Sequence, residues 1–302
     1  MALQFLLNGL IEGSMIGLGA IGVTLTYAIL RFSNFAHGDF MAWGAYSTLM
    51  LVGLIGSAVG TVAPIGPLSF GWPLILAGLG GMVFTGCLAL LLDWLLFARL
   101  RARGQAIVVV MASFGASMAL RNLLEFAFTS SPTYFSRKIQ IARPIGLGIR
   151  ITPDQTVLLG MTLVLVVGMH LLMTYSRTGR EMKAVSQNPA LARVVGIDLD
   201  RIVRMTWLIG GALASAAGLM VGVLVQIRPL MGLDMLLPMF AAAILGGIGS
   251  VPGAVLGGLV IGLSQAASVQ LVGAEWRQAV AFVILVAVLL VRPTGLFGVQ
   301  ER

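Results

Sequence analysis

The side chains that could support catalysis are few in this chain, and they do not form a catalytic pattern. The 302 residues contain one cysteine, Cys87, and two histidines, His37 and His170. Neither histidine has a cysteine or histidine neighbour, so the spacing predicts no metal site. Asp39 lies two residues after His37, but a catalytic His–Asp pair would need a nucleophile, and its neighbourhood offers none. The sequence therefore predicts that the protein is not an enzyme.

Several ionisable residues lie within apolar segments, where charge is costly and usually faces a cavity or a partner. Glu12 is the only acidic residue deep in such a segment. It either lines a substrate path, near an amino group, or pairs with a basic group at the outer interface. Arg121 and Glu125 are four residues apart on one helix face, which predicts a local ion pair. Asp93 is close to Arg99, which predicts an interfacial pair.

A polar stretch at 176–204 has the features of a folded surface element. It contains six basic and three acidic residues. Asn188 followed by Pro189 is typical of a helix start, because asparagine caps the free amides and proline at the first position loses no hydrogen bond. Gly196 supplies a stop signal. A short helix at 189–195 is therefore expected.

This short helix would carry an apolar stripe among charges. Leu191, Val194 and Val195 fall on one face, at the spacing i, i+3, i+4. A further turn or two of helix is expected before it, at 180–187. The stripe either packs against the chain's own helix ends or enters a groove of a partner protein.

The elements around these residues are predicted to be membrane helices. Hydrophobic residues make up 58% of the chain and charged residues 10%, whereas a soluble domain has about a quarter charged residues. The net charge of +8 lies in short stretches between apolar blocks, so no nucleic-acid partner is expected. Blocks near the length of about 20 residues that a transmembrane helix needs occupy 5–30, 40–57, 73–97, 105–128, 155–175, 205–227, 235–250, 253–272 and 276–291.

The number of crossings and their direction follow from these blocks. The block at 235–250 is short, contains Pro238 and ends in glycines, so a broken or re-entrant helix is expected there, and eight or nine crossings in all. With nine crossings and an outside N-terminus, 12 of the 19 basic residues lie on the inside. The positive-inside rule then predicts the N-terminus outside and the C-terminus inside.

The 39 glycines cluster in the apolar blocks, and several are four residues apart. Gly13 with Gly17 and Gly258 with Gly262 are two such pairs. Small residues at this spacing flatten a helix face and let two backbones approach closely. These faces serve either packing within the chain or contact with another membrane subunit.

Three motifs follow one another along the chain. The first runs from Tyr27 to Asp39 and holds the string Asn-Phe-Ala-His-Gly-Asp. The second, within 176–204, combines Thr-Gly-Arg, Asn-Pro, Ala-Arg and Gly-Ile-Asp. The third is glycine-rich and spans 243–254. In this order they resemble the branched-chain amino acid permease family of ABC importers, of the LivH type, and the resemblance covers nearly the whole chain.

The resemblance implies the architecture and the role. The fold would be an all-α polytopic bundle of about eight or nine transmembrane helices, with the ABC importer permease fold. Residues 1–302 would form a single transmembrane permease domain, and 176–204 its cytoplasmic coupling loop. The chain would translocate leucine, isoleucine and valine, delivered by a periplasmic binding protein, across the bacterial inner membrane.

The resemblance also implies partners. A second related permease would complete the membrane path, and two cytoplasmic ATP-binding subunits would power it. This chain lacks a G-x-x-x-x-G-K-[ST] loop, so ATP and Mg are expected in the partner subunits and no cofactor is expected in this chain.

The resemblance and the apolar stripe together assign residues to two sites. The family's coupling segment corresponds to Gly179, Glu181, Ala184, Asn188, Pro189, Ala192 and Gly196, and the stripe adds Leu191 and Val194. A path or gate would involve Glu12, Asn34, His37 and Asp39. His37 and Asp39 are expected at the inner end of the first helix pair. Asp39 has a second interpretation, because a carboxylate in the first turn complements the dipole of the second helix.

Three alternatives remain open. The same type of importer could carry urea, short amides or other amino acids. A secondary transporter without an ATPase would need intramembrane carboxylates for ion coupling, and 176–204 would then have no partner. An intramembrane enzyme would need a paired catalytic set at membrane depth, which the sequence does not offer.

Overall fold

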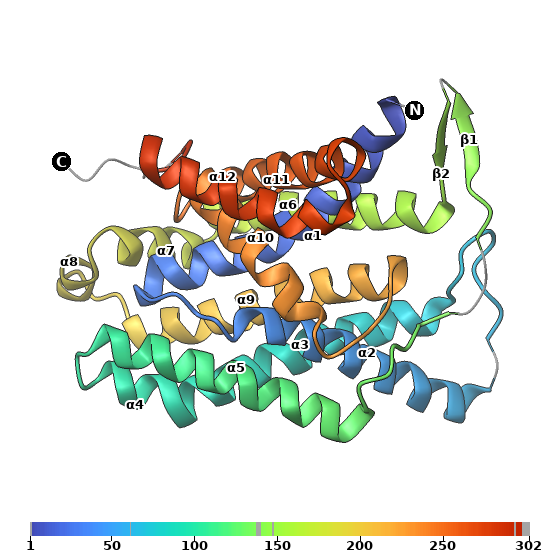
Figure 1. The fold of residues 1–302 in the computed structure, drawn as a ribbon. Helices are drawn as coiled ribbons and strands as arrows, with labels where there is room; N and C mark the ends of the chain where they lie inside the picture. Colours follow the sequence, from blue (N-terminus) through green and yellow to red (C-terminus); the bar gives the residue numbers. More distant parts are fainter. Residues whose placement is uncertain (1, 61, 137–139, 147, 293, 298–302) are drawn as a thin grey trace.

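The computed structural model describes residues 2–60, 62–136, 140–146, 148–292 and 294–297. These residues confirm the all-α class (Figure 1). The helices are α1 (Ala2–Leu30), α2 (His37–Val59), α3 (Trp72–Leu92), η1 (Asp93–Phe97), α4 (Ala98–Arg101), α5 (Ala106–Phe128), α6 (Pro153–Tyr175), α7 (Arg177–Gln187), α8 (Pro189–Val194), α9 (Leu199–Leu224), α10 (Met231–Gly246), α11 (Val251–Leu271), η2 (Ala274–Trp276) and α12 (Arg277–Val291). An antiparallel hairpin of β1 (Arg143–Gly146) and β2 (Ile149–Ile151) was not predicted.

The described residues contain eight helical segments that are long and apolar enough to cross a membrane. They correspond to the predicted blocks except the one at 235–250. That block forms α10, which has 16 residues, contains Pro238 and ends at Gly246. At about 1.5 Å per residue α10 is about 24 Å long, shorter than the hydrocarbon core of about 30 Å. The expected short helix is confirmed, and the chain is a multi-pass membrane protein.

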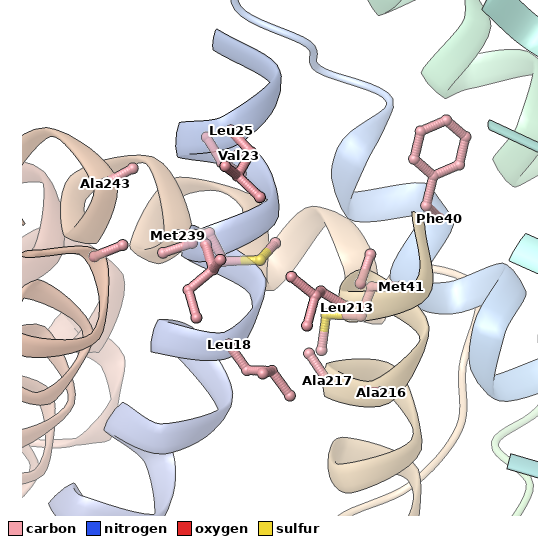
Figure 2. Close-up of a cluster of buried hydrophobic side chains, with 14 of the residues drawn as sticks. Leu18, Val23, Leu25, Phe40, Met41, Leu213, Ala216, Ala217, Met239 and Ala243 are labelled. Atoms are coloured by element: carbon pink, nitrogen blue, oxygen red, sulfur yellow. The ribbon is translucent and has the colours of Figure 1, made fainter. Parts of the chain in front are cut away.

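Helix α1 is the centre of the bundle. Of its 18-residue apolar stretch, 89% is buried inside the protein, a far larger share than in any peripheral helix. It packs against α11, α9 and α10. Figure 2 shows α1 between Met239 and Ala243 of α10 on one side and Leu213 and Ala217 of α9 on the other. A movement of α9 or α10 would therefore act directly on side chains of α1.

The glycine pairs of α1 and α11 serve packing within the chain. A Cβ on Gly258 would overlap the backbone of Gly17, and one on Gly262 would overlap that of Gly13. The two helices run antiparallel at this contact, because Gly9 faces Leu263 whereas Gly17 faces Val255. Of the two alternatives left open for these glycines, the structure shows the intramolecular one.

Helix α2 begins inside the bundle and not at its inner end. The Nε2 atom of His37, its first residue, lies 3.2 Å from the carbonyl oxygen of Gly19. Gly19 is eleven residues before Leu30, the end of α1, or about 16 Å along the helix axis. The segment 31–36 therefore returns into the bundle before α2 starts. The predicted position at the inner end was wrong for His37 and Asp39, since hydropathy reports apolar length and not depth.

A close contact between α2 and α10 holds this re-entrant start. A Cβ on Gly38 would overlap the carbonyl oxygen of Gly232, and a Cβ on Gly232 would overlap that of Gly38. Both glycines are the second residue of their helix. The absence of side chains lets two helix starts meet backbone to backbone.

We expect Gly232→Ala to destabilise the fold by about 1–3 kcal/mol, the usual cost of overpacking a closely packed contact. Gly53→Ala is the matched control on α2, because nothing lies within 4 Å of its added Cβ. Alanine favours a helix by up to about 1 kcal/mol over glycine, so the control should be neutral or stabilising. Thermal unfolding of the two purified variants checks this, and equal unfolding temperatures would contradict the contact.

The bundle has two distinct ends, visible in Figure 1. At one end the β1–β2 hairpin lies beside the start of α1, where the Gln4 side chain donates to the Arg150 carbonyl over 3.0 Å. At the other end α7 and α8 lie beside the end of α1, where the Arg31 guanidinium donates to the Ser186 carbonyl over 2.5 Å. These ends are called the hairpin face and the α8 face below.

Candidate functional site

The coupling segment begins with a helix longer than the one predicted at 180–187. Helix α7 starts at Arg177, with the Gly179 amide donating to the Ser176 hydroxyl over 2.9 Å. A Cβ on Gly179 would overlap the Leu172 carbonyl at the end of α6. Met182 and Val185 are buried beneath α7. Gly179 therefore lets α7 turn back tightly against α6, and its apolar face fastens it to the bundle.

Helix α8 is capped at both ends as the sequence predicts. The Leu191 amide donates to the Asn188 side-chain oxygen over 3.0 Å, and Pro189 is the first helical residue. Gly196 takes a φ of +86°, which glycine adopts without strain. The helix ends at Val194, one residue earlier than predicted. Neither cap depends on a distant contact, so the sequence around α8 specifies its shape locally.

The apolar stripe of α8 does not pack against the chain itself. Leu191 is 60% exposed, Val194 82% and Val195 67%, whereas Ala192, about 100° around the helix from Leu191, is 3% exposed. An apolar cluster at a polar membrane face commonly marks a protein contact. Of the two alternatives for the stripe, packing against the chain's own helix ends is wrong.

Six of the nine predicted coupling residues fall into two groups. Gly179, Ala192, Asn188 and Gly196 shape and seat the two helices. Leu191 and Val194 present side chains outward. Of the remaining three, Glu181 accepts from the Arg177 guanidinium over 2.8 Å, Ala184 is half-buried on α7, and Pro189 is exposed at the start of α8.

A buried polar group is built around Asp39, which is 1% exposed. Its carboxylate accepts from the Ser117 hydroxyl over 2.5 Å and from Nε of Arg121 over 3.3 Å. Arg121 also donates to the Ser117 hydroxyl over 3.1 Å. The predicted local pair of Arg121 with Glu125 is therefore wrong, because the guanidinium pairs with the buried carboxylate of Asp39 on α2 and not with the half-buried carboxylate of Glu125 on α5.

Asn34 and His37 shape the re-entrant segment. The Ala36 amide donates to the Asn34 side-chain oxygen over 3.1 Å, and the Phe35 amide donates to the Ser113 hydroxyl of α5 over 3.1 Å. The ring of His37 fills the space above Gly22 of α1, where a Cβ would collide with it. These contacts tie the segment to α1 and α5.

Glu12 lies apart from this group, and its partner is far away in sequence. It is seven residues before Gly19 on α1, about 10 Å along the axis toward the hairpin face. Its carboxylate forms an ion pair with Arg277, at the start of α12. A basic partner was one of the two alternatives for Glu12, and the structure shows it.

Asp93 also has a partner other than the one expected. It pairs with Arg101 over 2.6 Å, while Arg99 lies over the Trp94 ring at 5.8 Å. Asp93 is in the π-helical turn η1, which shifts the register along the helix. Asp93 thus forms an ion pair as predicted, but its partner is Arg101, two residues after Arg99.

Four residues that hold the buried carboxylates or the segment 31–36 in place were not predicted as site residues. They are Ser113, Ser117, Arg121 and Arg277. The three on α5 are spaced by four residues, so they form one stripe along that helix. That spacing, with a conspicuous charge at its end, is the signal that could have suggested a polar face toward Asp39. No local pattern connects Arg277 with Glu12.

Comparisons with known proteins agree with this architecture. The family described as "Branched-chain amino acid transport system / permease component" matches residues 5–289. The chain is 31% identical over 306 residues to the high-affinity branched-chain amino acid transport system permease protein LivH of Escherichia coli K12, covering 99% of this chain and 96% of that protein. It is 31% identical over 304 residues to the corresponding permease protein BraD of Pseudomonas aeruginosa, with the same coverage.

More distant relatives also match. A probable branched-chain amino acid permease protein LivH of Methanocaldococcus jannaschii is 25% identical over 314 residues, covering 99% of this chain and 94% of that protein. The autoinducer 2 import system permease protein LsrD of Klebsiella pneumoniae is 33% identical over 129 residues, which is 40% of this chain and 39% of that protein.

Proposed function

This chain belongs to the branched-chain amino acid transport permease family, and from that premise we propose that it translocates leucine, isoleucine and valine in an importer driven by ATP. The relatives are transport permease subunits, so the chain is a transport subunit and not an enzyme. ATP and Mg bind to two partner subunits on the α8 face. A second related permease completes the membrane path, and a periplasmic binding protein delivers the amino acid.

The observation that supports this proposal best is the outward stripe of α8. A rigid, capped helix exposes Leu191 and Val194 to water while its Ala192 is buried. Helix-in-groove recognition uses such an apolar face as the anchor. A partner that binds this face and moves would move α8 with it.

Two contacts connect the coupling segment with the central helices. Helix α7 is joined to the end of α1 through Arg31 and the Ser186 carbonyl. Helix α9 follows α8 directly, with the Arg201 amide donating to the Asp198 carboxylate over 3.0 Å. Closure of the ATPase dimer on ATP binding would shift α1 and α9 together and open the path outward, and hydrolysis would open it inward.

The proposed location is the bacterial inner membrane, with the α8 face in the cytoplasm and the hairpin face in the periplasm. The α8 face carries Arg177, Arg180 and Lys183 of α7 and Arg193 of α8. Basic residues favour the cytoplasmic side. The N-terminus would then be outside and the C-terminus inside.

A different cargo is the main alternative. The partial match to an autoinducer 2 permease associates a family member with a solute that is not an amino acid. Urea, short amides and other amino acids also remain candidates. A secondary transporter fits less well, because it would leave the exposed apolar stripe of α8 without a partner.

Affinity purification tests the proposed assembly. The tagged chain, expressed together with the ATP-binding subunits and second permease of the same system, should retain both, and the complex should hydrolyse ATP. The binding protein loaded with leucine should stimulate hydrolysis further. Stimulation only by another solute would change the cargo, and recovery of the chain without any ATP-hydrolysing partner would overturn the proposal.

A further inference from the structure

A small cavity lies on the hairpin-face side of the bundle. Its volume is about 220 Å³, and its walls come from α1, α9, α10, α11, α12 and the segment that connects α9 with α10. Pockets for drug-sized ligands measure roughly 300–1,000 Å³, so this one suits a ligand of few heavy atoms. It lies beside Glu12, in the N-terminal half of the central helix.

Six of the 13 residues that line the cavity have apolar side chains, and three of them are methionines. The apolar side chains of the wall are Met15, Val221, Val225, Met231, Met235 and Pro238. Methionine is unbranched and fills irregular space around differently shaped apolar groups. Such a wall accepts a branched aliphatic group without demanding one shape.

Two ion pairs line the same cavity. Glu12 pairs with Arg277, and Asp234 pairs with Arg228 over 2.6 Å. The Glu12 side chain is only 10% exposed, whereas the Arg277 side chain is 44% exposed. Gln278 connects the two pairs, because its Nε2 lies 3.5 Å from the Asp234 carboxylate and it follows Arg277 in the chain. Charges of both signs therefore stand beside one apolar wall.

We propose that this cavity binds a zwitterionic α-amino acid with an apolar side chain. The ligand's carboxylate would bind the Arg277 guanidinium, its ammonium group the carboxylate of Glu12, and its side chain the methionine-lined wall. The site rests on the proposed function and names residues that receive the cargo from the binding protein. Glu12 is thus both one member of an ion pair and a substrate contact.

The chemistry predicts selectivity for both charges. A zwitterion can replace each partner of the Glu12–Arg277 pair with an equivalent charge. A ligand with only one charge would leave a partly buried group without its counter-ion, which is costly. The head group of phosphatidylethanolamine also carries both charges and could reach the cavity from the bilayer, so the test includes it.

Equilibrium dialysis of radiolabelled L-leucine against the purified complex, without the binding protein, tests the site. Saturable binding is expected. Isoleucine should compete, but 4-methylpentanoate and 3-methylbutylamine, each lacking one charge, should not. Glu12→Gln and Arg277→Gln should each weaken binding at least tenfold. Glu275→Gln, a change at an exposed residue outside the lining, should leave binding unchanged.

The opposite results are equally informative. A Glu12→Arg/Arg277→Glu exchange keeps an ion pair. Leucine binding by that variant with the wild-type affinity would show that the pair serves only the structure, and it would refute the proposed binding site. Competition by a short-chain phosphatidylethanolamine with no leucine binding would make it a lipid site. If a complex that hydrolyses ATP does not bind leucine, the proposed binding site is refuted and the proposed function is not. If no ATPase associates with the chain, the proposed function is refuted. Dialysis of leucine against the purified chain by itself then shows whether the cavity binds an amino acid.

Discussion

Leu191→Asp together with Val194→Asp should remove the ATP-binding subunits from the purified complex while the chain still inserts and folds. Both side chains are mostly exposed, so their replacement costs this chain little stability, within about 0.5 kcal/mol. In a partner's apolar groove, each new carboxylate would lose its hydration without gaining a counter-ion. A loss of about 2 kcal/mol or more at an anchor residue means at least about thirtyfold weaker binding.

The measurement is the ratio of ATP-binding subunit to tagged chain after affinity purification. Arg103→Glu is the matched control, because it makes the same change in net charge at an exposed position on the α8 face, in the turn between α4 and α5. The control should retain the subunits. Retention in the double variant would show that α8 is not the docking element.

Arg121→Gln should strongly destabilise the bundle. It leaves the Asp39 carboxylate, 1% exposed, without its cationic partner, while the Ser117 hydroxyl still donates to it. Breaking a buried ion pair by removing one member costs about 3–5 kcal/mol, because the remaining charge stays buried and uncompensated. The expected result is a strong fall in the unfolding temperature and in the yield of folded protein.

A double-mutant cycle separates this cause from general damage at the site. Asp39→Asn together with Arg121→Gln removes both charges, so it should recover much of the stability lost in Arg121→Gln alone. Glu125→Gln, one turn further along α5, is the control and should have a small effect. Additive losses from the two single changes would contradict the pairing of Asp39 with Arg121.

The features predicted correctly from the sequence depend on local signals. Asn188, Pro189 and Gly196 act on the backbone of their own helix, and their effect is the same in any tertiary setting. The bounds of most apolar blocks were also recovered within a few residues, because the bilayer imposes a minimum apolar length. The short α10 followed from Pro238 and its terminal glycines.

The features that were missed depend on distant contacts. The i, i+4 rule connected Arg121 with Glu125, but the choice of partner was decided by Asp39, 82 residues away in sequence. The re-entrant segment was missed because hydropathy does not indicate how deep a helix begins, and its depth comes from His37 against α1 and Gly38 against Gly232. The functional roles assigned to the coupling and path residues stay predictions.

The most direct test of the account is leucine uptake by the whole importer. The chain, the second permease and the ATP-binding subunits are reconstituted in proteoliposomes, with ATP on the α8 face and loaded binding protein on the hairpin face. Uptake of radiolabelled leucine that requires both ATP and the binding protein is the predicted result. Leucine uptake that continues without ATP hydrolysis, or that follows an imposed ion gradient instead, would contradict the account.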